Sequence, residues 1–439
     1  MSQDFANAYA DRLKSAAEAA DLIPSGSKVA MAIGAGQPPA LLKAFAERAK
    51  AGQVEDINLY YLLSTGIAGD TVLQPELNDR IRPYSLFHSA IERNLEKLGA
   101  QEGRQRVWYI PSSFQQAPAV MINAGVDTLL ATVSPMDDEG YFTFGTNPDY
   151  AVPLSKVVER VILEVNANMP RVYGNTRVHI SDVTALVEND VDVLEAGKAP
   201  QAPQDIAIGQ IIAGMIEDGS TIQMGIGGLP DAVCAALKNH KDLGFHTELL
   251  TPGLVDLMRA GVITNAKKNF MPGKGVFAFS LGQRETYDFI HENPDLEGHP
   301  VDFVNDPSVI AKNDKMVSVN ATLQIDLFGA CCSEFLNGKQ FTAAGGQLDF
   351  VRGASASKGG KSIIACHSTA AKGTVSRIVA RLDGPATVAR NDIHYVVTEH
   401  GVAELRGKTV GERARALIAV ADPAFRDDLS RQARELGLI

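Results

Sequence analysis

The chain has 439 residues, of which 45% are hydrophobic and 21% are charged, and its formal net charge is −11. This length predicts two domains or two large lobes rather than one hydrophobic core. No apolar run approaches the roughly 18 residues that a membrane span requires, and the acidic balance argues against general nucleic-acid binding, in which lysine and arginine neutralise phosphates.

The first half begins with a predicted charged helix over Met1–Ala20, which has neither the apolar segment nor the cleavage site of a signal peptide. A glycine-rich segment, GSKVAMAIGAGQP (Gly26–Pro38), precedes a second predicted helix over Pro39–Ala49. The other elements predicted here are a helix over Leu86–Leu98 and short strands over Thr128–Val133 and Val161–Val165.

A stretch rich in proline, alanine and glutamine, AGKAPQAPQ (Ala196–Gln204), has no apolar periodicity and is the best linker candidate. It predicts a first lobe over residues 1–195, a linker over 196–206 and a second lobe over 207–439.

The second half opens on a repeat of the first. GSTIQMGIGGLP (Gly219–Pro230) carries Gly, Ser, Met, Ile, Gly, Gly and Pro in the same order as Gly26–Pro38, with one gap. Each copy predicts a strand, a glycine turn and a helix, the second helix being Asp231–Asn239. One match at a large offset indicates a duplicated α/β unit rather than a solenoid.

The remaining elements keep this alternation. They are predicted strands over Ser362–Ala365 and His394–Thr398, a helix over Gly411–Val420 and a last helix with Asp422 as N-cap and Pro423 at its first position. Strands alternating with helices predict an α/β fold with mainly parallel sheets, in which ligands bind at the carboxyl ends of the strands.

Three motifs could carry chemistry. The first is the turn from Gly225 to Pro230, whose glycines let a ligand approach the main chain at the N-terminus of the following helix. It is not the dinucleotide fingerprint, which needs a further glycine. A ligand role and a purely structural turn are both open from the pattern alone.

The second motif is DLGFHTELLTPG (Asp242–Gly253), an apolar run that ends near Glu248 before a helix predicted after Pro252. A desolvated carboxylate at a strand end can act as a nucleophile. From the pattern alone, a surface or capping glutamate is the stronger reading. His246 lies two residues away and would share its strand face; we interpret it as a structural histidine.

The third motif is FTAAGGQLDFVRG (Phe341–Gly353), where Gly345 and Gly346 could present backbone N–H groups to an oxyanion or form only a tight turn. The nearby SKGGKS imitates the tail of a phosphate-binding loop, but Ser355 stands where that motif needs its first glycine, and a strand follows it. No GxSxG elbow or HExxH motif is present, so serine-esterase and zinc-hydrolase chemistry have little support.

The four cysteines form no CxxC pair, and we expect buried free thiols and a cytoplasmic, reducing location. They are Cys234, Cys331, Cys332 and Cys366.

Taken together and in order, the motifs resemble the acetyl-CoA hydrolase/transferase family, especially its branch of 4-hydroxybutyrate and acetate CoA-transferases. In the first half the resemblance rests on VSPMDDEGYFTFGTNPDY and VNANMPRVYGNTRVHISD. In the second it rests on MGIGGLPDAV, LGFHTELLTPGLVDLMRAGVITN, AAGGQLDFVRGA, SKGGKSII and VVTEHGVAELRGK. It covers nearly the whole chain.

The resemblance implies two similar open α/β lobes with the active site between them, and a homodimer. It implies Glu248 as the nucleophile and coenzyme A (CoA) as a substrate rather than a tightly bound cofactor, with no metal. The residues implied to contact CoA or its oxyanions are Gly225, Ile226, Gly227, Gly228, Leu229, Asn320, Gly345, Gly346 and Lys372.

The sequence departs from the family pattern at three places. His400 stands where tyrosine is usual, Cys366 and His367 replace Leu-Pro, and Gln324 stands where an acid is common. None is the implied nucleophile, so the reaction class stands, but these departures weaken any assignment of the substrate.

The reaction that this resemblance implies is a ping-pong transfer of CoA through a glutamyl-CoA thioester. The alternatives are an acyl-CoA hydrolase, a non-catalytic CoA-binding protein and a sugar-phosphate isomerase on a related lobe. Acetate, butyrate, 4-hydroxybutyrate, succinate and itaconate are all reasonable acceptors. Lys267, Lys268 and Lys274 are candidates for the CoA phosphates, and an inward arginine (Arg104, Arg171 or Arg352) would favour a dicarboxylate.

Overall fold

The computed structural model describes residues 3–439 and divides the chain into two compact units. The first unit contains the residues up to Ala196 together with Phe277–Phe303, and the second contains Gly197–Val276 and Val304–Ile439. The first boundary falls at the start of the predicted linker, and helix α8 (Pro203–Met215) begins inside that linker. The return of Phe277–Phe303 to the first unit was not foreseen from the sequence.

The first unit is built on a seven-stranded sheet in the order β4-β3-β2-β1-β5-β7-β9. Its strands are parallel wherever their register is known, for example between β1 and β2 and between β1 and β5. The strands of this sheet are β1 (Lys28–Met31), β2 (Ile57–Tyr61), β3 (Ile81–Ser85), β4 (Trp108–Tyr109), β5 (Thr128–Val133), β7 (Arg160–Val165) and β9 (Ala185–Glu188). Two further strands, β6 (Tyr141–Thr143) and β8 (Arg177–His179), form a separate antiparallel pair.

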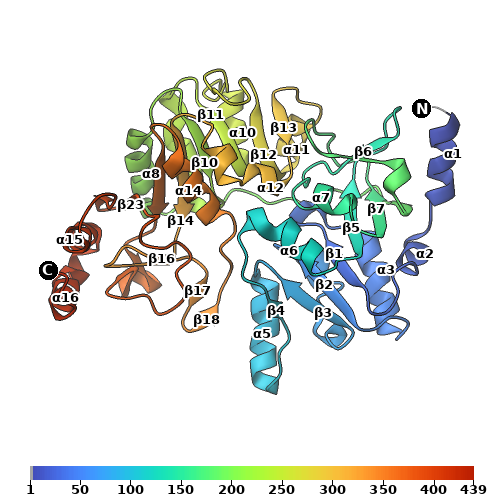
Figure 1. Ribbon diagram of the computed structural model, residues 1–439, viewed down its shortest axis with the longest axis horizontal. Helices are drawn as coiled ribbons and strands as arrows, with labels where there is room; N and C mark the ends of the chain where they lie inside the picture. Colours follow the sequence, from blue (N-terminus) through green and yellow to red (C-terminus); the bar gives the residue numbers. More distant parts are fainter. Residues whose placement is uncertain (1–2) are drawn as a thin grey trace. The chain divides into compact units, whose positions relative to one another are not determined.

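Helices alternate with these strands along the chain (Figure 1). They are α1 (Gln3–Arg12), α2 (Ala16–Ala20), α3 (Pro39–Lys50), α4 (Gly66–Gly69), α5 (Ala90–Glu102), α6 (Ala117–Asn123) and α7 (Ala151–Ser155). The returning segment carries most of β12 (Gly275–Ser280), all of α11 (Arg284–Ile290) and β13 (Leu296–Gly298), and most of α12 (Val301–Val304).

In the second unit the strands follow the order β11-β10-β14-β19-β23-β24. The pairs from β11 to β23 are parallel, and β24 closes the edge antiparallel to β23. These strands are β10 (Thr221–Met224), β11 (Gly244–Leu250), β14 (Met316–Ala321), β19 (Lys361–Ala365), β23 (Tyr395–Thr398) and β24 (Gly401–Glu404).

The helices of this unit, besides α8, are α9 (Gly228–Ala236), α10 (Pro252–Arg259), α13 (Pro307–Ile310), α14 (Gln347–Ala356), α15 (Val410–Val420) and α16 (Pro423–Glu435). Short strands form small sheets beside the main one: β15 (Gln324–Asp326), β16 (Cys331–Cys332), β17 (Phe335–Leu336), β18 (Lys339–Gln340), β20 (Thr369–Ala370), β21 (Val375–Ser376) and β22 (Ile378–Val379).

The two units share one topology, as the repeated glycine turn predicts. In each, the first strand (β1 or β10) lies inside the sheet, with the second strand on one side and a later strand on the other. The point where the strand order reverses is where open α/β sheets bind ligands. The α/β fold with two similar lobes is therefore confirmed.

Most predicted elements match the structure closely. The strand over Thr128–Val133 is confirmed residue for residue, and Asp422 caps α16 by accepting the Ala424 N–H at 2.9 Å. Of the helix predicted over Met1–Ala20, α1 and α2 are confirmed, with residues 1 and 2 outside the described range.

The helix predicted over Leu86–Leu98 begins later, at Ala90, because Ser89 caps it. The Ser89 hydroxyl accepts the Ile91 N–H at 3.0 Å, and the Glu92 carboxylate accepts the Ser89 N–H at 2.6 Å. This reciprocal capping fixes the first turn, so Leu86 through His88 stay outside the helix.

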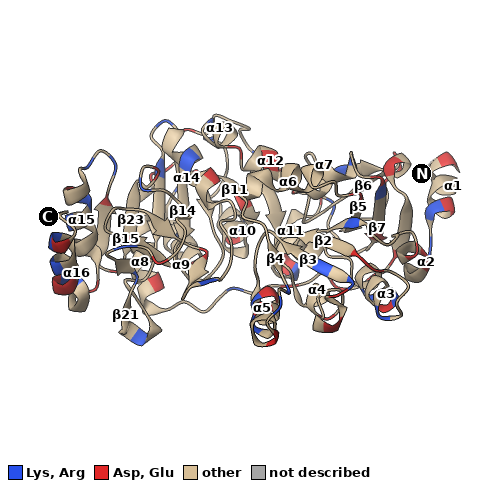
Figure 2. Cartoon of the chain, turned by 60° about the horizontal axis from the view of Figure 1, so that its bottom comes forward, with Lys and Arg blue, Asp and Glu red and all other residues tan. Residues whose placement is uncertain are grey.

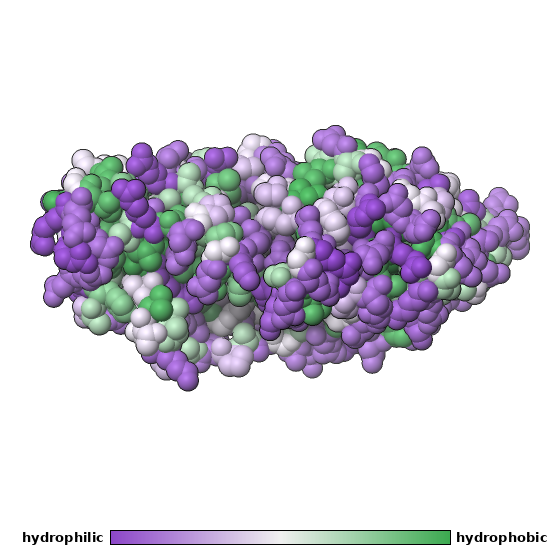
Figure 3. Space-filling model, turned by 90° about the horizontal axis from the view of Figure 1, so that it is seen from below, coloured by the Kyte–Doolittle hydropathy of each residue, from purple (hydrophilic) through white to green (hydrophobic). Residues whose placement is uncertain are grey.

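Each unit has its own apolar core. One cluster packs β1, β2 and α3 of the first unit, and another packs β19, β23, α15 and α16 of the second. The face seen in Figure 3 is mostly hydrophilic with small hydrophobic patches, and acidic and basic residues are interspersed on α5 and α16 in Figure 2. Within residues 3–439, no helix is long and apolar enough to cross a membrane.

A glycine brings two helices of the second unit unusually close. A Cβ placed on Gly353 of α14 would lie 2.5 Å from the Ile310 Cβ of α13, so only glycine fits there. The residues just before these helices, Asn305 and Gly346, are thereby held near each other. This packing matters for the site described next.

We predict that Gly353→Ala lowers the stability of the second unit by about 1–3 kcal/mol, because the added methyl overpacks the contact between α13 and α14. Gly214→Ala is the matched control, since a Cβ at that position of α8 would meet nothing within 4 Å. Thermal unfolding midpoints measure the difference. Equal midpoints for the two variants would contradict the packing argument.

Candidate active site

The predicted site residues of the second unit gather at one edge of its sheet. β10 ends at Met224 and leads into the glycine turn, β11 carries Glu248 near its end, and β14 carries Asn320. Since these strands are parallel, their carboxyl ends lie at the same edge. The site therefore sits where an α/β fold places its ligands.

The carboxylate of Glu248 is held from two directions. The side-chain amide of Asn305 donates from Nδ2 to Glu248 Oε2 at 2.6 Å. On another side lies Gly346, where an added Cβ would overlap both Glu248 Oε2 and Asn305 Nδ2. Glu248 itself is only partly exposed. The carboxylate is thus partly buried, with a donor already in place.

The Gly345–Gly346 pair is required by geometry. Gly345 has a φ of +55°, in the left-handed region that favours glycine, and Gly346 is the N-cap of α14. The N-terminus of a helix presents free N–H groups and a partial positive charge. An anion at Glu248 is therefore stabilised by α14, and an oxyanion formed there would be stabilised too.

His246 is a structural residue, as interpreted from the sequence. It is fully buried, and its Nε2 lies 2.7 Å from the main-chain oxygen of Val304. A carbonyl only accepts, so Nε2 carries the proton. The ring packs beside Phe270 and Phe350. His246 thus fixes the main chain immediately before Asn305.

The glycine turn is built to expose its main chain. Gly227 has a φ of +121° and is the N-cap of α9, and the side chain of Ile226 is 62% exposed. A Cβ on Gly228 would lie 2.8 Å from Pro200 O and 3.1 Å from Asp205 Oδ2, so the turn packs tightly on its other side. An exposed apolar residue beside free N–H groups suits a ligand with both apolar and anionic parts.

Asn320 is tied to the same edge. Its amide exchanges two hydrogen bonds with buried Gln223 of β10, at 3.2 and 3.4 Å. Asn320 therefore lies beside the end of β10 and the turn at Gly225.

Lys372 is exposed at the tip of the hairpin formed by β20 and β21, in the left-handed conformation with a φ of +57°. Its role in CoA binding stays a prediction.

Family models match both halves of the chain. The N-terminal domain of acetyl-CoA hydrolase/transferase matches residues 1–195, and the C-terminal domain matches residues 282–433. The chain belongs to the acetyl-CoA hydrolase/transferase family. This confirms the resemblance drawn from the sequence motifs.

The chain is similar to known CoA-transferases over nearly its full length. It is 41% identical to 4-hydroxybutyrate coenzyme A transferase of Clostridium kluyveri, over 97% of this chain and 98% of the relative. It is 40% identical to succinyl-CoA:cyclohexane-1-carboxylate CoA transferase of Geobacter metallireducens, over 98% and 97%. The crystal structure of RipA from Yersinia pestis has a TM-score of 0.97 and 50% identity over 100% of both chains.

Two of the lysines suggested for the CoA phosphates do not lie at this edge. Lys267 lines a cavity of about 560 Å³ with residues that precede β10, β11, β14 and β19, which is the opposite edge of the sheet. Lys268 is buried and donates to Phe245 O at 3.0 Å and Lys274 O at 2.5 Å. Lys267 and Lys268 therefore do not lie at the edge that carries Glu248, and the main-chain oxygen of Lys274 accepts a hydrogen bond from Lys268.

The three arginines considered for an acyl pocket are all committed to carboxylates of their own unit. Arg104 bonds Asp79 and Glu102, and Arg352 bonds Asp392. A preference for a dicarboxylate gains no support from them.

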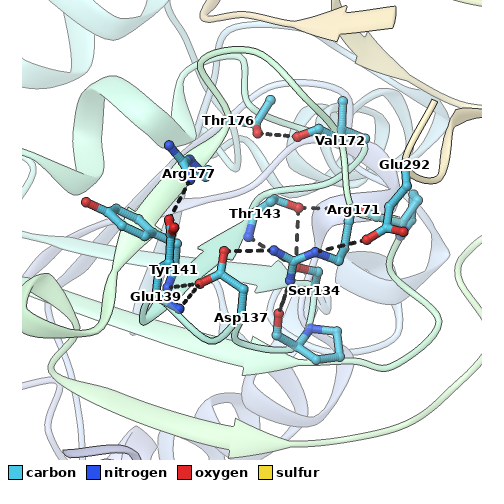
Figure 4. Close-up of polar contacts among 12 residues, drawn as sticks. Ser134, Asp137, Glu139, Tyr141, Thr143, Arg171, Val172, Thr176, Arg177 and Glu292 are labelled. Atoms are coloured by element: carbon cyan, nitrogen blue, oxygen red, sulfur yellow. Dashed lines mark hydrogen bonds and ion pairs between the residues drawn. The ribbon is translucent and has the colours of Figure 1, made fainter. Parts of the chain in front are cut away.

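Figure 4 shows the third, Arg171, which donates to Asp137 at 3.0 Å and to Pro135 O at 2.7 Å and lies 3.7 Å from Glu292. It lines a cavity of about 360 Å³ in the first unit. Its guanidinium joins two other segments of that unit, at Pro135 and Asp137 and at Glu292, and is not free to bind a dicarboxylate through two parallel hydrogen bonds.

The four cysteines are buried free thiols, as predicted. Burial raises the pKa of Cys234, Cys331 and Cys366 to about 12 and also raises the pKa of Cys332. A thiolate is the reactive form of cysteine, so burial disfavours the reactive form at all four positions. Among residues 3–439, no cluster of His, Cys, Asp or Glu could hold a metal ion.

Asn305 is the site residue that sequence reasoning missed. It precedes Asp306 and Pro307, which cap and start α13, so the segment carries only turn and capping signals. Its partner lies 57 residues away in the chain. The contact joins a glutamate near the end of a strand to an asparagine that precedes a short helix. No characteristic spacing in the sequence marks such a pair.

We predict that Lys268→Met lowers stability by about 1–3 kcal/mol, because the buried carbonyl of Phe245 and the part-buried carbonyl of Lys274 lose a side-chain donor. Lys267→Met should leave stability unchanged, and neither variant should change the apparent KM for an acyl-CoA. Thermal unfolding and steady-state kinetics measure both effects. A strongly raised KM in Lys267→Met would restore that lysine as a ligand of CoA.

Proposed function

We propose that this family member is a CoA-transferase that moves CoA from a short acyl-CoA to a small carboxylate through a glutamyl-CoA thioester on Glu248. The observation that carries the proposal is the Glu248 carboxylate, held by the Asn305 amide at the N-terminus of α14. Its full-length relatives are named as CoA-transferases, which supports an acyl-CoA:carboxylate transferase.

In the first half-reaction, a Glu248 oxygen attacks the thioester carbonyl, and the C–S bond breaks to give an acyl–glutamyl anhydride and CoA thiolate. The thiolate then attacks the glutamyl carbonyl carbon and releases the first carboxylate, which leaves the glutamyl-CoA thioester. An incoming carboxylate runs the same steps in reverse and departs as its CoA ester. Thioester is exchanged for thioester, so no ATP is needed.

The other site residues take roles that fit this cycle. Gly345 and Gly346 N–H groups would stabilise the tetrahedral oxyanions, a role whose loss costs roughly 100- to 1,000-fold in rate. The turn Gly225, Ile226, Gly227, Gly228 and Leu229, with Asn320 and Lys372, would bind CoA. Its nucleotide end supplies binding energy that can be used at the reacting carbonyl.

All of these residues belong to the predicted second lobe, 207–439, and none to the predicted first lobe, 1–195. We take 4-hydroxybutyrate, acetate, butyrate and similar small carboxylates as the acceptor class. A homodimer follows from the family resemblance. A cytoplasmic location is supported by the four unpaired cysteines.

The test is intact-protein mass spectrometry after incubation with acetyl-CoA or succinyl-CoA, followed by borohydride. We expect a CoA-sized adduct on the wild type that borohydride removes, and none on Glu248→Ala. Glu217→Ala, which removes an exposed glutamate, should keep the adduct.

An adduct that persists in Glu248→Ala would contradict the proposed nucleophile. CoA binding without any adduct, measured by calorimetry, would instead favour a hydrolase that does not accumulate the thioester or a non-catalytic CoA-binding protein.

A further inference from the structure

A histidine and an aspartate lie behind the glycine turn that is proposed to bind CoA. His367 follows β19, and Asp205 belongs to the first turn of α8. We propose that His367 is a positioning residue, which holds the Asp205 carboxylate away from the N–H groups of the turn and so keeps them open for CoA. This inference rests on the proposed function, since it concerns the same CoA-binding turn.

Both oxygens of the Asp205 carboxylate are held by donors. His367 Nε2 lies 2.6 Å from Asp205 Oδ1, and the Ala202 N–H donates to Asp205 Oδ2 at 2.8 Å. An ionised carboxylate only accepts, so Nε2 of His367 carries the proton. Asp205 is only 6% exposed. A carboxylate removed from water to this degree depends on such donors, and these two fix its orientation.

The carboxylate lies directly against the start of α9. A Cβ on Gly228, the first residue of that helix, would lie 3.1 Å from Asp205 Oδ2. Among residues 3–439, no side-chain hydrogen bond caps α9 at its N-cap, Gly227. A helix N-terminus presents free N–H groups and a partial positive charge, which attract an anion. Asp205 is thus an anion of the chain itself that could occupy these N–H groups in place of an anionic part of CoA.

The hydrogen bond from His367 opposes this competition. Without it, Asp205 Oδ1 loses its donor, and a buried acceptor that loses its donor is costly. The uncapped N–H groups at the start of α9 are replacement donors beside the carboxylate. Once Asp205 has turned to them, CoA has to displace it before binding. The bond from His367 therefore favours the orientation of Asp205 that leaves the turn open.

A second acid beside the turn is also held by a donor from the segment before α8. Asp231, in the first turn of α9, accepts the Ala199 N–H at 3.2 Å. The residues between Ala199 and Ala202 thus occupy one oxygen of each acid, and His367 supplies the further donor that Asp205 needs. His367 is also one of the positions at which the sequence departs from the family pattern.

The test measures the Kd for CoA by calorimetry and the steady-state kinetics with an acyl-CoA. We expect His367→Ala to raise the Kd and the KM by about 5- to 20-fold with kcat little changed, because an anion at a helix N-terminus then competes with the ligand. Adding Asp205→Asn to His367→Ala should restore both constants to within about twofold of the wild type, since a neutral amide is a weaker competitor. His367→Gln should resemble the wild type, because its amide can place an N–H near the position of Nε2.

His240→Ala is the matched control. His240 is also half-buried, and its Nε2 lies 3.1 Å from Ala213 O and 3.0 Å from Ile216 O, at the other end of α8. This variant should lower the unfolding midpoint but leave the Kd for CoA unchanged.

The double variant separates competition from a structural role, because a pair that only braces the fold gains nothing from a second substitution. A double variant that binds CoA no better than His367→Ala would overturn the inference, and so would an unchanged Kd in a folded His367→Ala. If His367→Ala does not fold, His367→Leu, which fills the space without a donor, replaces it in the same comparison. If the wild type itself binds no CoA, the proposed function fails.

Discussion

The second unit brings one partly exposed carboxylate, that of Glu248, against a buried side-chain amide and the N-terminus of a helix. Removing a charge from water is costly unless partners replace the solvent. At Glu248 these partners are the Asn305 amide and the N-terminus of α14. Both approach the carboxylate only because Gly346 has no side chain, and α13 and α14 approach each other only because Gly353 has none. Two glycines thus set the geometry of the proposed nucleophile.

The same scaffold occurs twice, but only one copy carries the carboxylate. Val29 of β1 pairs with Leu59, and Ile222, at the matching place in the repeat, pairs with Phe245. Three residues further along, the first unit has buried Leu62 where the second has Glu248. The duplicated fold therefore supplies the strand end and the glycine turn, while the chemistry depends on individual residues placed on it.

The sequence predicted local structure well because that structure depends on neighbouring residues. Strands such as Thr128–Val133, the caps at Asp422 and the glycine turns follow from short patterns. Glu248 was different, since its strand-end pattern favoured a surface residue and only the family resemblance identified it. Asn305 depends on packing between distant segments and left no pattern. The location of the lysines could not be predicted, because a basic cluster in the sequence does not reveal which edge of a sheet it occupies. The return of Phe277–Phe303 to the first unit could not be predicted either, because the composition of the chain does not change there.

The most direct measurement is peptide mapping by tandem mass spectrometry after incubation with an acyl-CoA, without an added acceptor carboxylate, and borohydride reduction. Borohydride converts a glutamyl thioester into the corresponding alcohol, so the modified residue is marked permanently. The account predicts that the peptide containing β11 carries this change at position 248. An unmodified Glu248 with the reduced side chain on another carboxylate would contradict it.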